Sequence, residues 1–345
     1  MKDELSRRNF VKTAGAVLGA APAVVPALGA NDKLNVAWIG VGTRGNYLMQ
    51  RFFAVPENKN EANVVAVCDA YKGYLARSKD LIQSNGGAPP KTYEDYKELL
   101  KDPSIDVVVI ATPEHLHYPM FMAAIKAGKN VYVEKPLAHT IEEGAEMVKA
   151  WQKSGKIVQV GTQNRSNTLY QKAKEMIGQG MIGDIHYVRA FWYRNSLDSD
   201  PAWRYVIPPD ASPENTAWDR FLEGTKKRNF DKQRFYQWRL YWDYSGGIST
   251  DLLVHQTDIT NFVCSKTVPS TCVSSGGIYR WPNDDREVPD VATIVADYDE
   301  GCQLLISATM INDHGLDEII RGRTATLKFG RQSAIKHGKW LERQK

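Results

Sequence analysis

The chain has 345 residues, of which 43% are hydrophobic and 24% charged, and its formal net charge is +4. This apolar content excludes an intrinsically disordered chain, and the length is typical of two domains rather than one. Without residues 1–30 the chain holds 40 basic and 38 acidic residues, an excess too small for a general nucleic-acid binder.

Two adjacent arginines precede a small, apolar segment at the N-terminus. Arg7 and Arg8 stand in Ser-Arg-Arg-Asn-Phe-Val-Lys, and residues 14–30 are rich in alanine, glycine and proline. This arrangement resembles a twin-arginine export signal, and its composition and length are wrong for a membrane span. We expect residues 1–30 to direct export to the periplasm or beyond, without stable membrane insertion. The alternative is a basic arm on a cytoplasmic protein.

From residue 34 to about residue 161, short apolar runs alternate with longer amphipathic stretches. Such alternation is typical of βα units around a parallel sheet, and runs rich in valine and isoleucine suit strands buried on both faces. Strands are expected at 34–39, 64–68, 107–111, 131–133 and 157–160. The pattern predicts an α/β, Rossmann-like dinucleotide-binding domain over residues 31–163.

A glycine-rich turn comes directly after the first predicted strand and opens a helix. Small residues there let the backbone approach a pyrophosphate at the helix N-terminus. Asp69 ends the second strand, 24 positions after the last glycine, where a carboxylate accepts hydrogen bonds from a ribose diol and repels a 2′-phosphate. NAD is therefore favoured as the cofactor, while the arginine of the turn keeps NADP open. The loop residues are Gly40, Gly42, Thr43, Arg44 and Gly45.

Lys135 follows the strand expected at 131–133. Its ammonium is thus predicted at the carboxyl end of a parallel strand, where open α/β sheets bind their ligands. Gln163 and Arg165 follow the strand expected at 157–160 and fall near the same sheet edge. They are candidates to contact nicotinamide or substrate, or else ordinary polar residues of a loop.

Beyond residue 161 the composition changes. Residues 191–244 hold fourteen of the 35 aromatic residues, five of them tryptophans. A helix is expected at 249–263, and strands at 272–279, 291–298, 302–310 and 319–329. Consecutive strands joined by short turns are typical of an antiparallel sheet. We predict an α+β domain with an open, mainly antiparallel sheet over residues 164–345.

The helix expected at 249–263 carries an aspartate and a histidine four residues apart. This spacing puts Asp251 and His255 on one helical face, where the pair can share one substrate hydroxyl. A histidine accepts a proton from an alcohol near neutral pH, and a nearby carboxylate orients it. Taken alone, such a pair is also common as a surface or core hydrogen bond.

No metal site is expected. The four cysteines have no Cys-x-x-Cys spacing and no histidine at a spacing typical of zinc ligands, and the remaining histidines are isolated.

Three motifs, in this order, resemble the Gfo/Idh/MocA family of oxidoreductases. They are the glycine-rich turn, the Glu-Lys-Pro around Lys135, and Gly-Gly followed by Asp251 and His255. The run Thr-Pro-Glu-His-Leu-His at 112–117 also fits, and the likeness covers residues 34 to about 330.

The resemblance implies an NAD(P)-dependent sugar dehydrogenase or reductase. It implies that Lys135, Asp251 and His255 carry catalysis on a bound sugar or cyclitol, and that Glu134 lies near the nicotinamide ribose. It also places three residues along the cofactor, namely Thr112, Pro113 and His117. Four tryptophans of the aromatic segment are candidates to stack on the sugar or to fill a core: Trp203, Trp218, Trp238 and Trp242.

The residues fit hydride chemistry in two ways. In the first, His255 removes the hydroxyl proton while Lys135 stabilises the developing alkoxide. In the second, Lys135 transfers the proton and His255 positions the substrate. The sequence does not choose between these roles.

Two positions depart from the family pattern. Glu114 stands where the family typically has asparagine, and Ser245 stands where a third glycine usually precedes Gly246-Gly247. Relatives rich in aromatic residues commonly continue beyond the last strands, whereas this chain ends at Lys345 after a basic segment. We therefore also expect a C-terminally truncated family member.

Three functions are compatible with these sequence features. The first is an exported sugar dehydrogenase. The second is a redox-neutral glycosidase that oxidises the sugar transiently and returns the hydride. The third is a catalytically degenerate nucleotide- or sugar-binding protein. The resemblance further implies a homo-oligomer formed through the C-terminal sheet.

Overall fold

The computed structural model describes residues 33–329, and from Leu34 onward these residues form one compact unit with two six-stranded sheets. The export signal predicted over residues 1–30 and the basic segment over 331–345 lie outside the described residues.

The first sheet is parallel throughout, with the strand order β3-β2-β1-β4-β5-β6. Its strands are β1 (Leu34–Ile39), β2 (Ala62–Cys68), β3 (Lys91–Tyr93), β4 (Val107–Ile110), β5 (Asn130–Val133) and β6 (Val158–Val160). The five strands predicted from apolar runs are confirmed. The short edge strand β3 was not predicted, because its three residues carry no apolar run.

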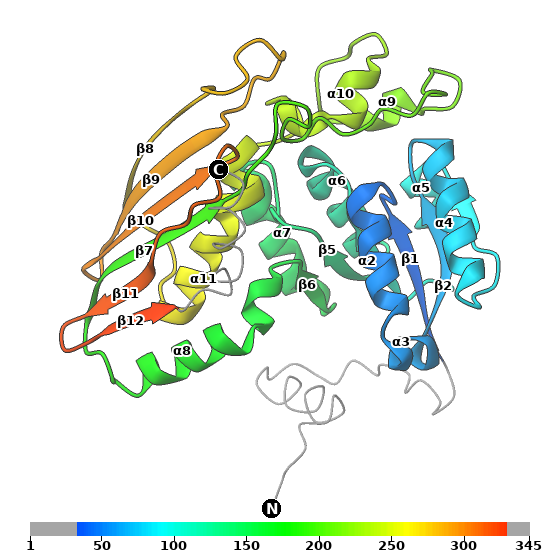
Figure 1. The fold of residues 1–345 in the computed structure, drawn as a ribbon. Coiled ribbons are helices and arrows are strands. Elements are labelled where there is room, and N and C mark those ends of the chain that lie inside the picture. The colour runs from blue at the N-terminus through cyan, green and yellow to red at the C-terminus, as the bar shows by residue number, and fades with distance from the viewer. Residues whose placement is uncertain (1–32, 330–345) are drawn as a thin grey trace, which may run out of the picture. The chain divides into compact units, whose positions relative to one another are not determined.

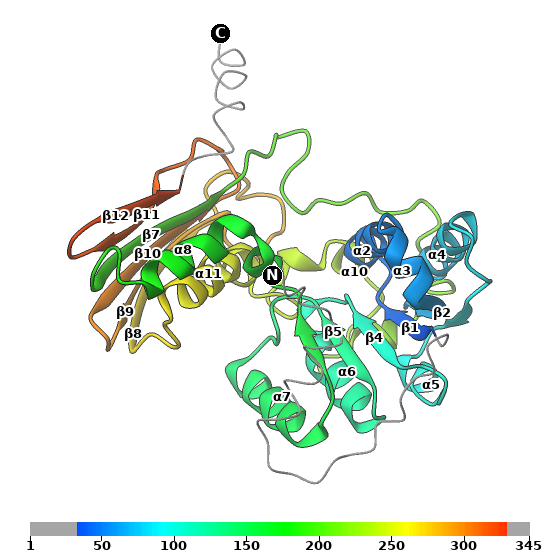
Figure 2. The same ribbon diagram turned by 90° about the horizontal axis from the view of Figure 1, so that it is seen from below.

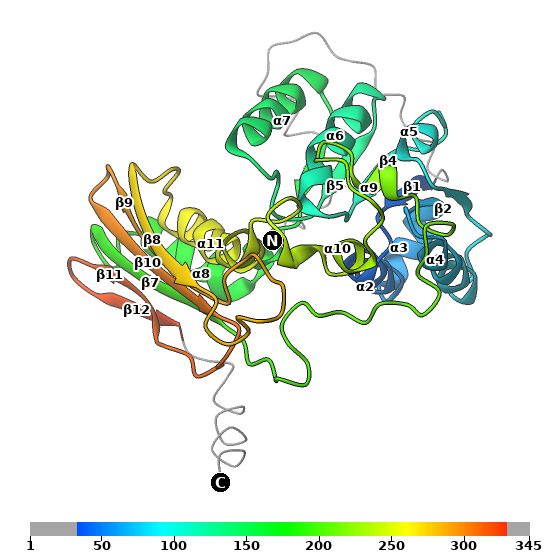
Figure 3. The same cartoon turned by 90° about the horizontal axis from the view of Figure 1, so that it is seen from above.

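Helices cover both faces of the first sheet. They are α2 (Thr43–Phe53), α3 (Pro56–Glu61), α4 (Lys72–Ser84), α5 (Tyr96–Leu99), α6 (Glu114–Lys126) and α7 (Ile141–Ser154). Figures 2 and 3 show α2 and α4 on one face and α6 and α7 on the other. Each face has its own core: Trp38 and Met49 belong to one, and Ile39 and Phe121 to the other. Because both faces of the sheet are buried, the strand sequences do not alternate between apolar and polar residues.

The second sheet is mainly antiparallel, as predicted, with the order β12-β11-β7-β10-β9-β8 and one parallel pair, β7 with β10. Its strands are β7 (Ile185–Tyr193), β8 (Thr271–Gly277), β9 (Val291–Tyr298), β10 (Cys302–Thr309), β11 (Glu318–Gly322) and β12 (Thr326–Phe329). Strand β7 was not predicted, and the single run expected at 319–329 is two strands around a turn.

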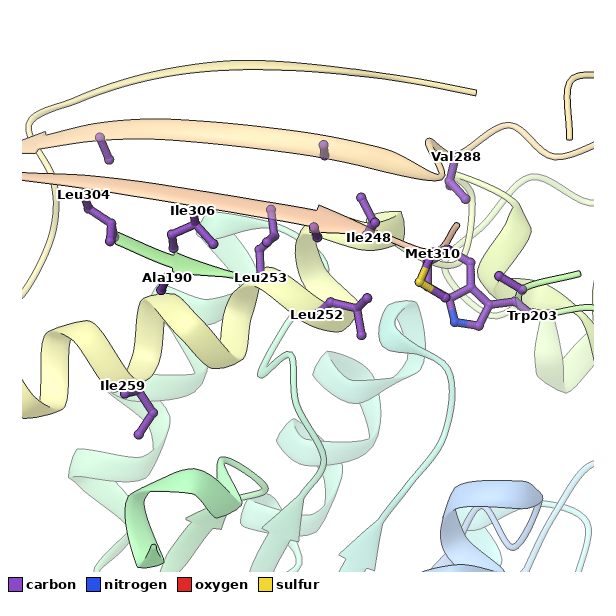
Figure 4. Packing of buried hydrophobic residues seen from close by; sticks show 14 of the residues in the cluster. Ala190, Trp203, Ile248, Leu252, Leu253, Ile259, Val288, Leu304, Ile306 and Met310 are labelled. Carbon is purple, nitrogen blue, oxygen red and sulfur yellow. The ribbon is translucent and has the colours of Figure 1, made fainter. Parts of the chain in front are cut away.

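One face of the second sheet is covered by two helices, α8 (Thr168–Gly178) and α11 (Val254–Cys264), while its other face carries no helix of the described chain (Figure 1). Figure 4 shows Leu253, just before α11, pointing toward the strand that carries Leu304 and Ile306, whereas Ile259 projects from the side of α11 turned away from the strands. All of these residues belong to one apolar core.

Short elements connect β7 to α11. They are α9 (Trp218–Phe221), α10 (Lys232–Tyr236), the 3-10 turn η2 (Trp238–Leu240) and the π-helical turn η3 (Ser249–Leu253). Another 3-10 turn, η1 (Gln163–Ser166), follows β6. The aromatic segment therefore forms mostly irregular structure, stabilised by a large buried core that includes Trp203, Trp218 and Tyr244.

Candidate active site

A cavity of about 460 Å³ lies at the carboxyl ends of the first sheet. One side, the N-terminal wall, is formed by residues between 39 and 163; the other, the C-terminal wall, by residues between 192 and 255. Its volume is in the range of small-molecule and cofactor sites.

The glycine-rich turn forms the N-terminal wall beside α2. Gly40 has a positive φ of 85°, and a Cβ on Gly45 would lie 2.0 Å from the Gly40 carbonyl oxygen, so both glycines are required by packing. Gly42 differs, because the nearest atom to a Cβ there is 3.3 Å away on Tyr74. No described side chain caps α2, and no acidic residue lies in its first turn. This helix end fits a pyrophosphate.

Asp69 lies at the end of β2 and lines the same wall. Its carboxylate accepts hydrogen bonds from the backbone nitrogens of Val41 (2.8 Å) and Tyr71 (3.0 Å). Burial raises the pKa of Asp69 to about 6, although these hydrogen bonds and the charge of Arg77 oppose the shift. The carboxylate is thus fixed beside the glycine turn, where a ribose diol is expected.

Arg44 pairs with Glu134 and forms no ion pair with Asp69 in the described chain. Its guanidinium forms an ion pair with Glu134 (2.7 Å), which also accepts a hydrogen bond from the Tyr132 hydroxyl (3.0 Å). The buried Glu134 carboxylate attracts Arg44, so this arginine is less available to bind the 2′-phosphate of NADP. The cation beside Asp69 is Arg77, which sequence reasoning did not single out.

The segment after β4 contributes Thr112 and Pro113 to the cavity. His117, predicted to lie along the cofactor, is instead buried behind the wall. Its ring nitrogens lie 2.7 Å from the carbonyl oxygen of Pro136 and 3.0 Å from that of Thr112. Its position one helical turn into α6 turns it toward the two loops, and it holds together the segments that carry Thr112 and Lys135.

Lys135 joins the two walls. Its ammonium donates to the carbonyl oxygen (2.5 Å) and to a carboxylate oxygen (2.9 Å) of Asp251. Arg239 donates to the same carboxylate oxygen at 3.1 Å. These two cations hold the pKa of Asp251 well below its usual range, against the effect of burial, which is the largest single influence and acts to raise it. One of the three ammonium hydrogens of Lys135 remains for a ligand.

Asp251 and His255 both line the cavity, but no hydrogen bond joins them in the described structure. The helix expected at 249–263 begins with the π-helical turn η3, which changes the spacing of side chains around its axis. In addition, Lys135 and Arg239 compete for the carboxylate. No hydrogen bond of the described structure shows Asp251 orienting His255 directly, although Asp251 raises the pKa of His255 and so favours its charged form.

His255 is positioned by stacking. Its ring lies 4.9 Å from that of Trp192, nearly parallel to it, and its buried Nδ1 has no hydrogen-bond partner within the described chain. Burial and the charge of Lys135 lower the pKa of His255 to about 4, with Asp251 opposing the shift. The imidazole is accordingly neutral near pH 7 and able to accept a proton.

The two departures from the family pattern contact each other. The Glu114 carboxylate, at the start of α6, accepts hydrogen bonds from the Ser245 hydroxyl (3.1 Å), the Gly246 nitrogen (2.8 Å) and the Thr250 hydroxyl (2.7 Å). Glu114 is only 1% exposed, and burial raises its pKa. Glu114 thus connects the first sheet to the turn that carries Asp251.

Of the remaining residues predicted to contact nicotinamide or substrate, some line the cavity and others lie outside it. Gln163 lines the cavity, whereas Arg165 pairs with Asp258 at 2.5 Å. Of the four named tryptophans only Trp238 lines the cavity; Trp203 and Trp218 are buried in the core, and Trp242 is largely exposed.

Sequence reasoning missed several residues of the C-terminal wall. They are Trp192, Arg194, Tyr205 and Arg239. The only available signal was the density of aromatic residues over 191–244, which does not separate wall from core.

Within residues 33–329, no three His, Cys, Asp or Glu side chains are grouped as metal ligands. In the same part of the chain, no helix has the length and apolar character needed to cross a membrane.

Two family models match the chain. The model described as "Oxidoreductase family, NAD-binding Rossmann fold" covers residues 34–162, and the model for the GFO/IDH/MocA C-terminal domain covers residues 220–328. Together they span both sheets and both walls of the cavity.

Named relatives are similar over part of their length. An inositol 2-dehydrogenase/D-chiro-inositol 3-dehydrogenase of Lactiplantibacillus plantarum is 34% identical over 149 residues, 43% of this chain and 41% of that protein. A glycosyl hydrolase family 109 protein of Stenotrophomonas maltophilia is 30% identical over 199 residues, 54% of this chain and 42% of that protein. The chain thus spans about two fifths of the length of these relatives.

Solved structures show the same fold. Levoglucosan dehydrogenase in complex with NADH superposes with a TM-score of 0.65 at 22% identity, covering 86% of this chain and 73% of that one. Myo-inositol 2-dehydrogenase from Lactobacillus plantarum superposes with a TM-score of 0.66 at 22% identity, covering 87% and 77%.

Proposed function

Because the chain belongs to the Gfo/Idh/MocA oxidoreductase family, we propose that it transfers a hydride between NAD and a hydroxyl-bearing carbon of a sugar, glycoside or cyclitol. The observation that carries this proposal is the contact of Lys135 with Asp251, which joins the dinucleotide loop to the neutral His255 in one cavity. The dehydrogenase names of the similar proteins support the substrate class.

The N-terminal wall supplies the cofactor groups. The free backbone donors at the start of α2 would hold the pyrophosphate, and Asp69 the ribose diol. Glu134 and Gln163 line the same cavity and would lie toward the nicotinamide. When bound, NAD⁺ accepts the hydride that leaves the carbon of the substrate.

The C-terminal wall and Lys135 act on the substrate hydroxyl. The neutral His255 removes the hydroxyl proton, since its lowered pKa leaves it unprotonated near pH 7. The Lys135 ammonium stabilises the developing alkoxide in a site screened from bulk water. Asp251 does not act on the substrate directly; it holds Lys135 and Arg239 at fixed positions.

A second function within the same chemistry is a redox-neutral glycosidase. The glycosyl hydrolase family 109 relatives favour it, because they match at 30–32% identity over about half of this chain. In that reaction the aglycone is eliminated from the oxidised sugar, water adds to the resulting double bond, and the hydride then returns to the sugar, so NAD is not consumed.

One experiment separates these functions. The purified protein is analysed for bound nucleotide and then given paired sugars and glycosides, while reduced cofactor and product masses are followed. Net formation of reduced cofactor supports the dehydrogenase, and glycoside cleavage without it supports the glycosidase. If the protein turns over no substrate with any nucleotide, both enzymatic functions are contradicted, and the remaining function is that of a nucleotide- or sugar-binding protein.

We also propose export by the twin-arginine route, on the evidence of Arg7 and Arg8 followed by the apolar segment. Replacing both arginines by lysine in the full chain is expected to retain the protein in the cytoplasm. Equal periplasmic amounts of the two forms would contradict the proposal.

Finally, we propose that the helix-free face of the second sheet pairs with a second copy of the chain. Val273, Val295 and Leu305 lie in register across β8, β9 and β10 on that face; Arg189 continues this row on β7, and Phe191 lies two residues further along β7, opposite Ser307. Sedimentation is expected to show a dimer or larger assembly that dissociates in Leu305→Lys. A monomeric wild-type protein would contradict this proposal.

A further inference from the structure

Five cationic side chains line the cavity, and they differ in their partners. Four form ion pairs: Arg44 with Glu134, Lys135 and Arg239 with Asp251, and Arg220 with Asp95. The fifth, Arg194, has no carboxylate partner within 4.0 Å among the residues of the described chain. Among the cavity-lining cations, Arg194 is therefore the one without an ion pair inside residues 33–329.

The backbone of Arg194 is anchored to the second sheet, while its side chain is exposed. It follows β7 directly, and its backbone nitrogen donates to the carbonyl oxygen of Thr309 at the end of β10 (2.8 Å). Its guanidinium lies 5.7 Å from the ring centre of Trp192. The sheet thus holds the base of the side chain, and the tryptophan holds its end.

Trp192 also connects Arg194 to the catalytic end of the cavity. Its ring stacks on His255 with a centroid distance of 4.9 Å, and Arg194 lies near enough to His255 to depress the pKa of the imidazole. A single sugar whose hydroxyl meets His255 can therefore place another substituent at Arg194.

Positive charge gathers on this side of the cavity. Lys135 and Arg239 pair with the same carboxylate, that of Asp251. Glu114 acts on Arg239 through its charge, and Arg194 adds a further positive charge without an ion pair of its own in the described chain. A neutral sugar neutralises none of this charge, whereas an anionic group does. Arginine presents a planar fork of donors that matches a carboxylate or phosphate with two parallel hydrogen bonds.

We propose that the substrate carries an anionic substituent, a carboxylate or a phosphate, which Arg194 binds while His255 and Lys135 act on a hydroxyl of the same sugar. This assignment rests on the proposed function for the identity of the ligand as a sugar. It narrows the substrate class from neutral sugars and cyclitols to sugar acids or sugar phosphates, and it makes Arg194 a specificity-determining residue.

The test is binding to the NADH-loaded full chain, measured by calorimetry. The probes are D-glucuronate and D-glucose 6-phosphate, each compared with D-glucose. A charged hydrogen-bonded pair predicts that at least one anionic sugar binds about 10- to 100-fold more tightly than glucose. The preference is expected to shrink as salt is raised. Which probe binds more tightly distinguishes a sugar acid from a sugar phosphate.

Three variants complete the test. Arg194→Gln is expected to abolish the preference for the anionic sugar, and Arg194→Lys to restore part of it. Arg280→Gln is the matched control, because Arg280 is an exposed arginine paired with Asp198 outside the cavity, and its loss changes the net charge equally. This control is expected to keep the full preference.

The outcomes separate the two proposals. Equal binding of glucose and both anions, no binding of any probe, or an unchanged preference in Arg194→Gln would overturn the role of Arg194. If the preference depends on Arg194 but the protein transfers no hydride to or from any of these sugars, the binding site stands and the proposed reaction fails.

Discussion

The two walls of the cavity are built in different ways. The N-terminal wall consists of successive strand ends, so its chemistry is carried by short continuous motifs such as the glycine turn and the Glu-Lys-Pro around Lys135. The C-terminal wall gathers single side chains from β7, from the irregular segment and from η3 and α11, namely Trp192, Arg194, Arg239, Asp251 and His255.

This difference separates binding from specificity. A helix end and a strand-end carboxylate recognise parts that every dinucleotide shares, and such recognition requires few side chains. A wall of scattered side chains can change one residue at a time without disturbing the sheet. We therefore expect changes in the glycine turn and at Asp69 to alter cofactor affinity, and changes in the C-terminal wall, or at Lys135 and Glu114, which contact it, to alter turnover and substrate choice.

The largest effect is expected at His255. Loss of a positioned proton acceptor in His255→Gln should lower kcat by roughly 10²- to 10⁴-fold, without weakening NADH binding. Because the pKa of His255 is lowered to about 4, the wild-type imidazole should remain deprotonated from pH 7 down to pH 5. If kcat instead falls at acidic pH with a midpoint near the ordinary histidine pKa, and if this fall is absent in His255→Gln, the buried environment described for His255 is contradicted.

Substitution of Lys135 tests the contact between the two walls. Lys135→Gln removes the ammonium that stabilises the alkoxide, and kcat should fall by about 10²- to 10³-fold while the Kd for NADH is retained. Lys172→Gln on the exposed face of α8 is the control, and it should behave as wild type. A comparable loss of NADH affinity in Lys135→Gln would assign the lysine to the cofactor instead.

Glu114 tests whether the two departures from the family pattern are coupled. Glu114→Asn loses hydrogen bonds to the turn that carries Asp251, so kcat/KM should fall by about 10- to 100-fold through turnover and substrate KM. Adding Ser245→Gly restores the residue pair typical of the family and should recover part of the loss. Strictly additive losses in the double variant would show that the positions act independently.

The smallest effect is expected at Asp69. Asp69→Asn should raise the Kd for NADH by about 10-fold, because the amide is a weaker acceptor for a ribose hydroxyl. Since the pKa of Asp69 is raised to about 6, wild-type affinity should weaken as the pH falls below that value. Fluorescence titration of NADH from pH 5 to pH 8 checks this, and a pH dependence that persists in Asp69→Asn would assign it to another group.

Prediction from sequence succeeded where a motif and a strand end coincide. The apolar runs located five strands of the first sheet, and the order of strand, glycine turn and helix placed Asp69 and Lys135 at the cavity. It failed where contacts join distant segments. Nothing local showed that Arg239 would share Asp251 with Lys135, or that Glu114 would bind the turn at Gly246.

Residue spacing along the helix also predicted side-chain positions only in part. Four-residue spacing predicted that Asp251 and His255 share one helical face, but this spacing assumes a regular α-helix, and the helix begins with a π-helical turn. Likewise, the tryptophans of the aromatic segment look alike in sequence, yet Trp203 is core and Trp238 is cavity wall. Only the tertiary contacts distinguish them.

The most direct test of hydride transfer between the walls uses deuterium. The NAD-loaded protein is mixed with sugars deuterated at every ring carbon, acidic and neutral, and the reaction is quenched within the first turnover for mass analysis of the nucleotide. We predict reduced nicotinamide that carries one deuterium with the wild-type protein, and none with Lys135→Gln. Unlabelled nicotinamide from the wild-type protein with every sugar would contradict the account.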